Sequence, residues 1–380
     1  MANGNDSDRI RLRRFWSTAS GYWKGKSAIS AWLLTLSLLV MGVAQLVVQY
    51  RLNYWNRDFF NALERRDGIG LWNQAAIFVP LACLSVGLRV ASVWGRMTTQ
   101  RQWRQWLTTD ILNAWLVREH YRRLETISLE SKNAEYRISY DARTATDAPV
   151  DLALGFVTSA LTAFVFIDVL WSVGGNYTML LGRVALTIPG YLVLGVGIYS
   201  LVFTGVMMAI GRRLPATIQA QSQAEAEFLA TANQIRESGN HNNHATATPD
   251  EIGKAWSTLR EVLARWRQLC WQLMGTTLVT QTDLLFAPVF AWVLCAPKYL
   301  AGTMTLGELT QASAAFVTVQ LAFNWLVDNY QRLADWRSAV NRVAALLLAL
   351  DAVELAERQE QAGSASLGVQ EAGNSGRELA

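Results

Sequence analysis

Long apolar runs alternate with polar, charged segments along the chain. Six of the runs are long enough to cross the roughly 30 Å hydrocarbon core of a bilayer, which takes about 20 residues of α-helix. They occupy residues 28–48, 71–94, 152–172, 184–210, 274–296 and 306–327. The pattern predicts an all-α membrane protein with six transmembrane helices.

Two long polar segments between these runs keep a helical periodicity. In residues 95–151 and 211–273, leucine, tryptophan and charged residues recur at the spacing of amphipathic helices, for example in WRQWLTTDILNAWLVREHYRRL and EIGKAWSTLREVLARWRQLCWQL. We therefore expect helices that extend out of the membrane into water.

The distribution of Lys and Arg predicts the orientation of the helices, because basic residues accumulate on the cytoplasmic side. The second and fourth loops are rich in both, whereas the third has only Arg183 and the fifth only Lys298. The first loop, with four arginines, is an exception. Before the first run, basic residues alternate with Phe15, Trp16 and Trp23, which suits a helix lying in the membrane interface. Both termini and the two long loops are therefore expected to be cytoplasmic.

Composition agrees with a membrane protein that has aqueous extensions, since 51% of residues are hydrophobic and 17% are charged. The net charge of +4 comes from residues spread over many loops, so we expect no nucleic-acid partner. Cys83, Cys270 and Cys295 lack metal-ligand spacing and are predicted to be packed free thiols. His241 and His244 form an H-x-x-H without a third ligand nearby, which favours a solvated loop over a metal site.

Ionisable groups at membrane depth are costly and often functional. Asp283 lies near the middle of the fifth run, in a polar stretch that includes Thr280 and Gln281. Lipid does not tolerate such a face, so we predict that it lines a water-filled cavity and that Asp283 is a substrate or proton site. The alternative is a locally hydrogen-bonded structural carboxylate.

Three further polar residues lie within the apolar runs. Asp168 is nearer the outer end of the third run, where a carboxylate can reach the headgroups, and is a second candidate for the cavity. Gln320 and Asn324 are one turn apart in the sixth run and could face the same cavity or form bonds between helices. His120 is predicted to be a lone residue on a helix surface with no role.

Three stretches carry a resemblance to a known family: LNYWNRDFFNALERRD after the first run, NAEYRISYD in the second loop and AEAEFLATANQIRES in the fourth. They are similar to segments of the BacA/SbmA family and of its relatives, the YddA-type and peroxisomal fatty-acyl ABC transporters. The resemblance implies an ABC-exporter-like (type IV) transmembrane domain over residues 28–351, after an N-terminal cytoplasmic or interfacial segment, residues 1–27.

The resemblance also implies roles for matched residues. In the first stretch the matching positions are Asn53, Trp55, Phe60, Ala62, Leu63 and Asp67. In this family the second loop lies near the contact with the nucleotide-binding domain, which implies that the matching residues of the second and fourth loops couple the two parts. They are Asn133, Arg137, Ile138 and Asp141 in the second loop and Glu225, Phe228, Arg236 and Glu237 in the fourth.

An ATP-driven transporter needs the phosphate-binding loop G-x-x-x-x-G-K-[ST]. The nearest segment, Gly21 to Ser27, is one residue too short and follows no buried strand, so we reject it. Residues 352–380 are polar and rich in small residues, which predicts a flexible linker or tail. We expect no cofactor in this chain. ATP and magnesium would act only through a nucleotide-binding domain that continues the chain or is separate, unless the protein works without one.

The leading hypothesis is a homodimeric permease of the bacterial inner membrane that moves hydrophilic cargo. Peptides or a cobalamin-like molecule are cargo classes that the resemblance alone implies. The first alternative is a proton-coupled SbmA/BacA-type peptide permease without an ATPase. A membrane enzyme is a distant alternative, because no cluster of His, Cys or paired carboxylates has catalytic spacing.

Overall fold

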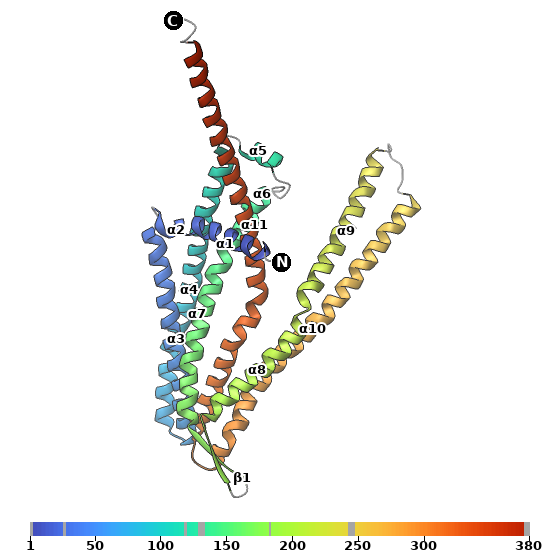
Figure 1. Ribbon diagram of the computed structural model, residues 1–380. Helices are drawn as coiled ribbons and strands as arrows, with labels where there is room; N and C mark the ends of the chain where they lie inside the picture. The colour runs from blue at the N-terminus through green and yellow to red at the C-terminus, as the bar shows by residue number, and fades with distance from the viewer. Residues whose placement is uncertain are drawn as a thin grey trace. The chain divides into compact units, whose positions relative to one another are not determined.

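The chain is almost entirely helical and divides into two compact units in a computed structural model (Figure 1). The first unit comprises Met1–Val48, Leu81–Thr158 and Asn329–Ala380, and the second comprises Gln49–Pro80 and Ser159–Asp328. The structure describes residues 3–25, 28–117, 120–127, 134–181, 184–241 and 248–375.

The elements follow one another as long helices joined by short turns. In chain order they are α1 (Asn3–Ala19), α2 (Gly21–Lys24), α3 (Ala28–Glu64), α4 (Gly68–Leu116), α5 (His120–Ile127), α6 (Ala134–Tyr136), the π-helical turn η3 (Arg137–Asp141), α7 (Ala142–Gly174), β1 (Asn176–Leu181), β2 (Val184–Pro189), α8 (Tyr191–Gly211), α9 (Leu214–His241), α10 (Pro249–Leu300) and α11 (Leu306–Ser375).

Five helical stretches among the described residues are long and apolar enough to cross a membrane. They are Ala28–Glu64, Gly68–Leu116, Ala134–Gly174, Tyr191–Ser238 and Pro249–Leu300. These stretches include the first, second, third and fifth predicted runs and the fourth from Tyr191 on. Helix α9 follows α8, and α9 and α10 lie next to each other (Figure 1). The sixth run lies in α11, whose apolar sequence is interrupted by Gln311, Gln320 and Asn324. A sixth span therefore stays a prediction.

A β-hairpin replaces the beginning of the predicted fourth helix. Residues 184–189 form β2, which pairs antiparallel with β1 so that Val184 lies opposite Leu181. Helix α8 begins only at Tyr191, after Gly190 with a φ of 60°. A side chain at Gly190 would also collide with the ring of Trp171. The prediction of a helix from residue 184 was wrong, because a short apolar run rich in β-branched residues is compatible with either element.

The N-terminal helices pack into the core of the first unit. This core joins α1 and α2 to α3, α4, α7 and α11, and its largest buried side chains are Phe15, Tyr22, Trp103, Leu107, Ile111 and Leu346. Arg14 of α1 donates from Nε and Nη2 to the two carboxylate oxygens of Asp351 on α11, at 2.6 and 2.7 Å. This hydrogen bonding raises the pKa of Arg14 above its usual value. The N-terminal segment is thus fixed to α11.

Helix α11 continues as far as Ser375, through residues predicted to form a flexible tail. Near the start of that region, Glu357 is buried, with Oε2 3.2 Å from Nε2 of His120 on α5. The other ring nitrogen of His120 lies 2.9 Å from the carbonyl oxygen of Ala114. The prediction of a surface histidine was therefore wrong: His120 is only 5% exposed, because α5 packs against α11.

Two helices begin with capping boxes that the sequence encodes. At the start of α10, the Thr248 hydroxyl accepts from the Glu251 amide, and the Glu251 carboxylate accepts from the Thr248 amide at 2.9 Å. These hydrogen bonds lower the pKa of Glu251. Thr305 and Glu308 form the same pair of bonds at the start of α11. Both pairs satisfy amides that a helix start leaves without intrahelical acceptors.

An ion pair between a buried carboxylate and a partly exposed arginine connects the π-helical turn to α11. The Asp141 carboxylate is 0% exposed and accepts from Nε and Nη2 of Arg342 at 2.9 and 2.8 Å. The hydrogen bonds to Asp141 raise the pKa of Arg342 above its usual value. Two parallel bonds between planar groups fix orientation as well as distance.

We predict that Asp141→Asn lowers the free energy of unfolding by about 1.5–3 kcal/mol, because the substitution removes charge-assisted hydrogen bonds from a buried site. Thermal denaturation of the purified protein measures the effect as a lower midpoint. The control is Asp147→Asn, which breaks a pair with the 61% exposed side chain of Arg143 and should cost less than about 0.5 kcal/mol. Equal shifts for the two variants would contradict the structural role of Asp141.

Candidate functional site

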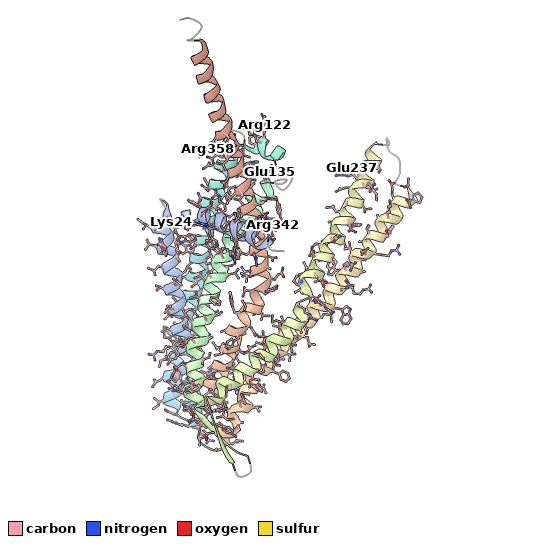
Figure 2. The ribbon with its side chains drawn as sticks, in the orientation of Figure 1. Lys24, Arg122, Glu135, Glu237, Arg342 and Arg358 are labelled. Carbon is pink, nitrogen blue, oxygen red and sulfur yellow. The ribbon has the colours of Figure 1, made fainter. Side chains whose placement is uncertain are left out.

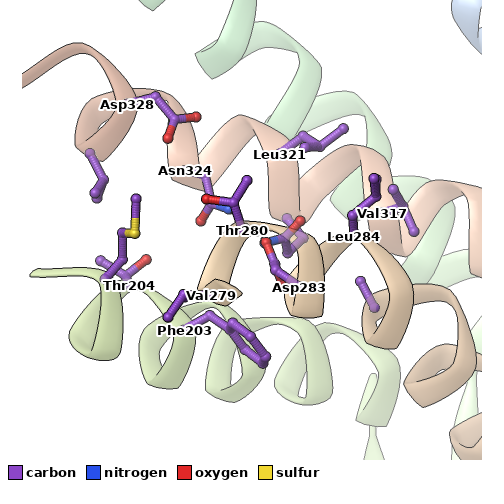
Figure 3. A pocket seen from close by; sticks show the side chains of 14 residues that line it. Phe203, Thr204, Val279, Thr280, Asp283, Leu284, Val317, Leu321, Asn324 and Asp328 are labelled. Atoms are coloured by element: carbon purple, nitrogen blue, oxygen red, sulfur yellow. Dashed lines mark hydrogen bonds between the residues drawn. The ribbon is translucent and has the colours of Figure 1, made fainter. Parts of the chain in front are cut away.

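A cavity of about 130 Å³ lies within the second unit, between α8, α10 and α11 (Figure 3). Its walls are largely apolar and include Phe203 of α8, Val279 of α10 and Val317 of α11. The polar side chains that line it are Thr204, Thr280, Asp283, Gln320, Asn324 and Asp328. A small group of polar side chains therefore lies between three apolar helices, with Asp283 and Gln320 buried and Thr280 and Asp328 exposed.

Asp283 is the most constrained polar group of this cavity. Asp283 is only 7% exposed. Its Oδ2 accepts one hydrogen bond from Nε2 of Gln320 and another, at 3.0 Å, from Nδ2 of Asn324. The hydroxyl of Tyr199 lies 3.5 Å from the Asp283 carbonyl oxygen. The other carboxylate oxygen, Oδ1, is buried without a hydrogen-bond partner among the described residues.

A buried acceptor without a donor costs roughly 1–3 kcal/mol. A proton, a water molecule or a donor group of a bound molecule would remove that cost at Oδ1 of Asp283. The site can therefore bind a hydrogen-bond donor or a cation, or take up a proton. Each of these is chemistry that a transport pathway needs.

The α11 side of the cavity is built from a regular spacing. Gln320, Asn324 and Asp328 are each four residues apart, so they lie along one face of the helix. Thr280 and Asp283, three residues apart, share a face of α10 in the same way. The structure thus brings Asp283, Thr280, Gln320 and Asn324 together at one cavity.

The other two candidate cavity residues lie elsewhere. Gln281 does not line the cavity and is exposed, because neighbouring residues of an α-helix point about 100° apart. Asp168 is exposed on α7 and also does not line the cavity. Gln281 and Asp283, two residues apart on α10, thus have different surroundings.

Sequence reasoning missed Tyr199 and Asp328. Asp328 was placed one residue beyond the sixth run, although its four-residue spacing from Asn324 is a signal that could have found it. No local pattern marks Tyr199, since its approach to Asp283 depends on the packing of α8 against α10. With Asp328 included, two carboxylates line the same cavity.

The family stretch after the first run, in α3, holds the start of α11. Asn53 donates from Nδ2 to the Gln311 carbonyl oxygen at 3.1 Å. Oδ1 of Asn61 accepts from the Gly307 amide, and the Glu64 carboxylate accepts from the Leu306 amide, both at 3.0 Å. These contacts fix the start of the helix that carries Gln320, Asn324 and Asp328.

The predicted coupling residues fall in both units. Arg137 and Asp141 belong to η3 in the first unit, and Asn133 lies outside the described residues. The other four lie on α9 in the second unit, where Figure 2 shows Glu237 near the end of the helix: Glu225, Phe228, Arg236 and Glu237. Glu225 accepts from its helical neighbour Gln221 at 2.6 Å.

Two motifs considered from the sequence fall partly outside the described residues. Gly21 to Lys24 forms α2, and a side chain at Gly21 would collide with the ring of Trp106, so this glycine serves packing. Positions 26 and 27 of that segment are not described, nor is His244 of the H-x-x-H. Of the three free thiols, Cys295 is buried, whereas Cys83 and Cys270 are exposed within the chain.

Comparison with known protein families decides the class of this helical assembly. The ABC transporter transmembrane region 2 family matches residues 24–300, which include Asp283 and the whole of α10. The chain belongs to this family. It is therefore an integral membrane protein and a membrane component of the ABC transporter type.

Individual relatives agree with the family. The inner membrane ABC transporter ATP-binding protein YddA of Escherichia coli is 25% identical over 88% of this chain and 60% of the relative. An uncharacterized ABC transporter ATP-binding protein of Synechocystis is 26% identical over 82% of this chain and 44% of the relative. ABC transporter D family member 2, chloroplastic, of Arabidopsis thaliana is 22% identical over 87% of this chain and 45% of the relative. These matches confirm the resemblance to YddA-type transporters, and the chain spans about half the length of these relatives.

We predict that a cysteine at Thr280 reacts with a water-soluble maleimide at least about tenfold faster than one at Leu285, because thiolate formation requires a polar environment. Thr280 lines the cavity, whereas Leu285 lies on α10 outside it and is exposed where lipid would cover it. The three native cysteines are first replaced, and labelling is followed by mass spectrometry in membranes. Equal rates at the two positions would contradict a water-accessible cavity.

Proposed function

We propose that this chain is the membrane-spanning half of a homodimeric ABC-type transporter that moves hydrophilic cargo. The observation that carries the proposal is the buried group of Asp283, Gln320 and Asn324 between otherwise apolar helices. In a membrane such groups persist where they face protein or water, and they mark the pathways of ions and polar substrates.

Asp283 is the residue proposed to contact cargo or a proton. Its unpartnered Oδ1 accepts from a donor on the cargo, while Gln320 and Asn324 hold Oδ2 in place. Thr280 and Asp328 supply further hydrogen-bonding groups at the same cavity. Peptides and cobalamin-like molecules are proposed as cargo because both present many such donors.

The proposed energy source is ATP, through a nucleotide-binding domain that binds ATP and magnesium. The names of the relatives support this, since they are ATP-binding proteins longer than the matched region. In this proposal Arg137 and Asp141 of the second loop, and the four matched residues of α9, lie at the contact with that domain. The sixth span, in α11, completes a type IV transmembrane domain.

A proton-coupled permease of the SbmA/BacA type is the second candidate. It is favoured by one observation, the presence of Asp283 and Asp328 at a single cavity. Acidic side chains at one cavity within a membrane are typical of proton pathways in transporters. The gene sequence beyond codon 380 separates the two candidates, because a phosphate-binding loop there indicates ATP and a stop codon favours protons or a separate subunit.

We predict that Asp283→Asn reduces uptake of a fluorescent cationic peptide or of cyanocobalamin by at least about tenfold, equivalent to roughly 1.4 kcal/mol. The substitution keeps the shape of the side chain and removes its charge. With proton drive, the remaining uptake loses its pH dependence. With ATP drive, affinity for the cationic peptide falls more than turnover.

The matched control is Asp168→Asn, which removes a carboxylate that lies outside the cavity and should leave uptake close to that of the parent. Size-exclusion chromatography establishes that both variants fold. An Asp283→Asn protein that transports both probes like the parent at every pH would remove this residue from the mechanism.

We also propose that the protein lies in a bacterial inner membrane with both termini in the cytoplasm. In a background without native cysteines, we predict that cysteines at positions 135 and 240 are labelled only from the cytoplasm and one at position 177 only from outside. The reason is the concentration of Lys and Arg in the second and fourth loops. Labelling of position 135 from outside would reverse the orientation.

A further inference from the structure

The first unit contains an open apolar cavity of about 800 Å³ that has no part in the proposed transport site. It lies between α1, α2, α3, α4, α7 and α11. Its lining is dominated by aliphatic side chains and by five tryptophans: Trp16, Trp23, Trp32, Trp103 and Trp336. Tryptophan is concentrated at the level of lipid headgroups in membrane proteins, and a cavity of this volume accommodates a small amphiphilic molecule.

The charge at this cavity has one sign. Among the described residues that line it none is acidic, and Lys24 at the end of α2 is the one basic residue. Lys24 is exposed (Figure 2) and makes no hydrogen bond or ion pair with the part of the chain that the structure describes. The ammonium group of Lys24 is therefore available to bind an anionic group beside the cavity.

One buried hydrogen-bond donor of the cavity lining has no acceptor among the described residues. The indole of Trp23 lies 3.4 Å from the Thr35 hydroxyl, and that of Trp336 donates to the Ala145 carbonyl at 3.3 Å. Trp103 is 2% exposed, and its indole N–H is buried without an acceptor among the described residues. A buried donor of this kind is costly unless a bound molecule or water accepts from it.

We propose that this cavity binds one acyl chain of an anionic glycerophospholipid from the surrounding bilayer. The acyl chain lies against the aliphatic wall formed by α3 and α7, and the phosphate lies beside Lys24. An ester carbonyl of the lipid accepts from the indole N–H of Trp103. Such a lipid supplies an apolar tail, a hydrogen-bond acceptor and an anion, which are the three kinds of group that this cavity can bind.

The occupant is lipid rather than transported cargo because the wall lacks the polar groups that hydrophilic cargo requires. Apart from Lys24 and the indole N–H groups, the polar groups of the described lining are hydroxyls, and those of Ser20, Thr35 and Thr99 already donate to nearby backbone carbonyls. The bound lipid would connect α1 and α2 to the transmembrane helices in the first unit.

The test uses the purified full chain in detergent, stripped of lipid and titrated with phosphatidylglycerol that carries a diazirine on one acyl chain. After illumination, mass spectrometry maps the cross-links. We expect saturable labelling within residues 149–157 and around Trp103. Unlabelled phosphatidylglycerol should compete about fivefold better than phosphatidylcholine, the effect of one lysine near an anionic headgroup.

Two variants separate the acyl chain from the headgroup. Val157→Trp fills the cavity and should abolish labelling at residues 149–157, while the matched control Val86→Trp, at an exposed residue that does not line the cavity, should not. Lys24→Glu should keep labelling but lose the preference for phosphatidylglycerol. Lys254→Glu, on α10 and also outside the cavity, is its control.

Several results would overturn the proposal. They are labelling that does not saturate, labelling that detergent alone displaces as well as phosphatidylglycerol does, and Val157→Trp labelled like the parent. Equal competition by the two lipids in the parent would overturn the role of Lys24. Should Val157→Trp fail to fold, saturation and competition in the parent and in Lys24→Glu still decide the question.

Discussion

A carboxylate within a helix of the membrane must have hydrogen-bond donors from its neighbours, and the second unit is arranged to supply them to Asp283. An unpartnered charge between apolar helices costs several kcal/mol. Gln320 and Asn324 donate to one oxygen of Asp283, and Tyr199 approaches its backbone carbonyl. α8, α10 and α11 must therefore pack in one register for the site to form.

That register depends on how α11 is held, because α11 supplies both side-chain donors. In the second unit, its first residues are bound by Asn61 and Glu64 of α3 and by its own capping box. In the first unit, a later part of the same helix is bound by the carboxylate of Asp141 and by Arg14. Ion pairs with two hydrogen bonds define the rotation of a helix more sharply than apolar contacts do. The family-matching residue Asn53 thus helps to hold α11 in the second unit, and Asp141 holds the part of α11 that belongs to the first.

The two cavities differ in their chemistry, and the difference follows from which groups are left without partners. At Asp283 the unsatisfied atom is an acceptor, in a site surrounded by hydroxyl and amide groups. At Trp103 it is a donor, in an apolar site with a lysine at its edge. The first arrangement suits donors and cations, whereas the second suits an amphiphile with an anionic head.

The sequence by itself determined the helical architecture, five apolar helices long enough to cross a membrane, the family and the polar stretch that contains Asp283. These features depend on local physics: the length of apolar runs, the spacing of capping residues such as Thr248 and Glu251, and the cost of a carboxylate in lipid. The four-residue spacing of Gln320 and Asn324 likewise placed them on one face before their partner was known.

Only the tertiary structure decided which of the polar side chains in the apolar helices come into contact with one another. It separated Asp283 from Gln281, brought Tyr199 and Asp328 to the cavity, and buried His120 against Glu357. It also formed a hairpin at residues 184–189, where an apolar β-branched run was compatible with a strand or a helix. Contacts between residues 40 to 240 positions apart are fixed by the packing of whole helices, and no local pattern of residues records that packing.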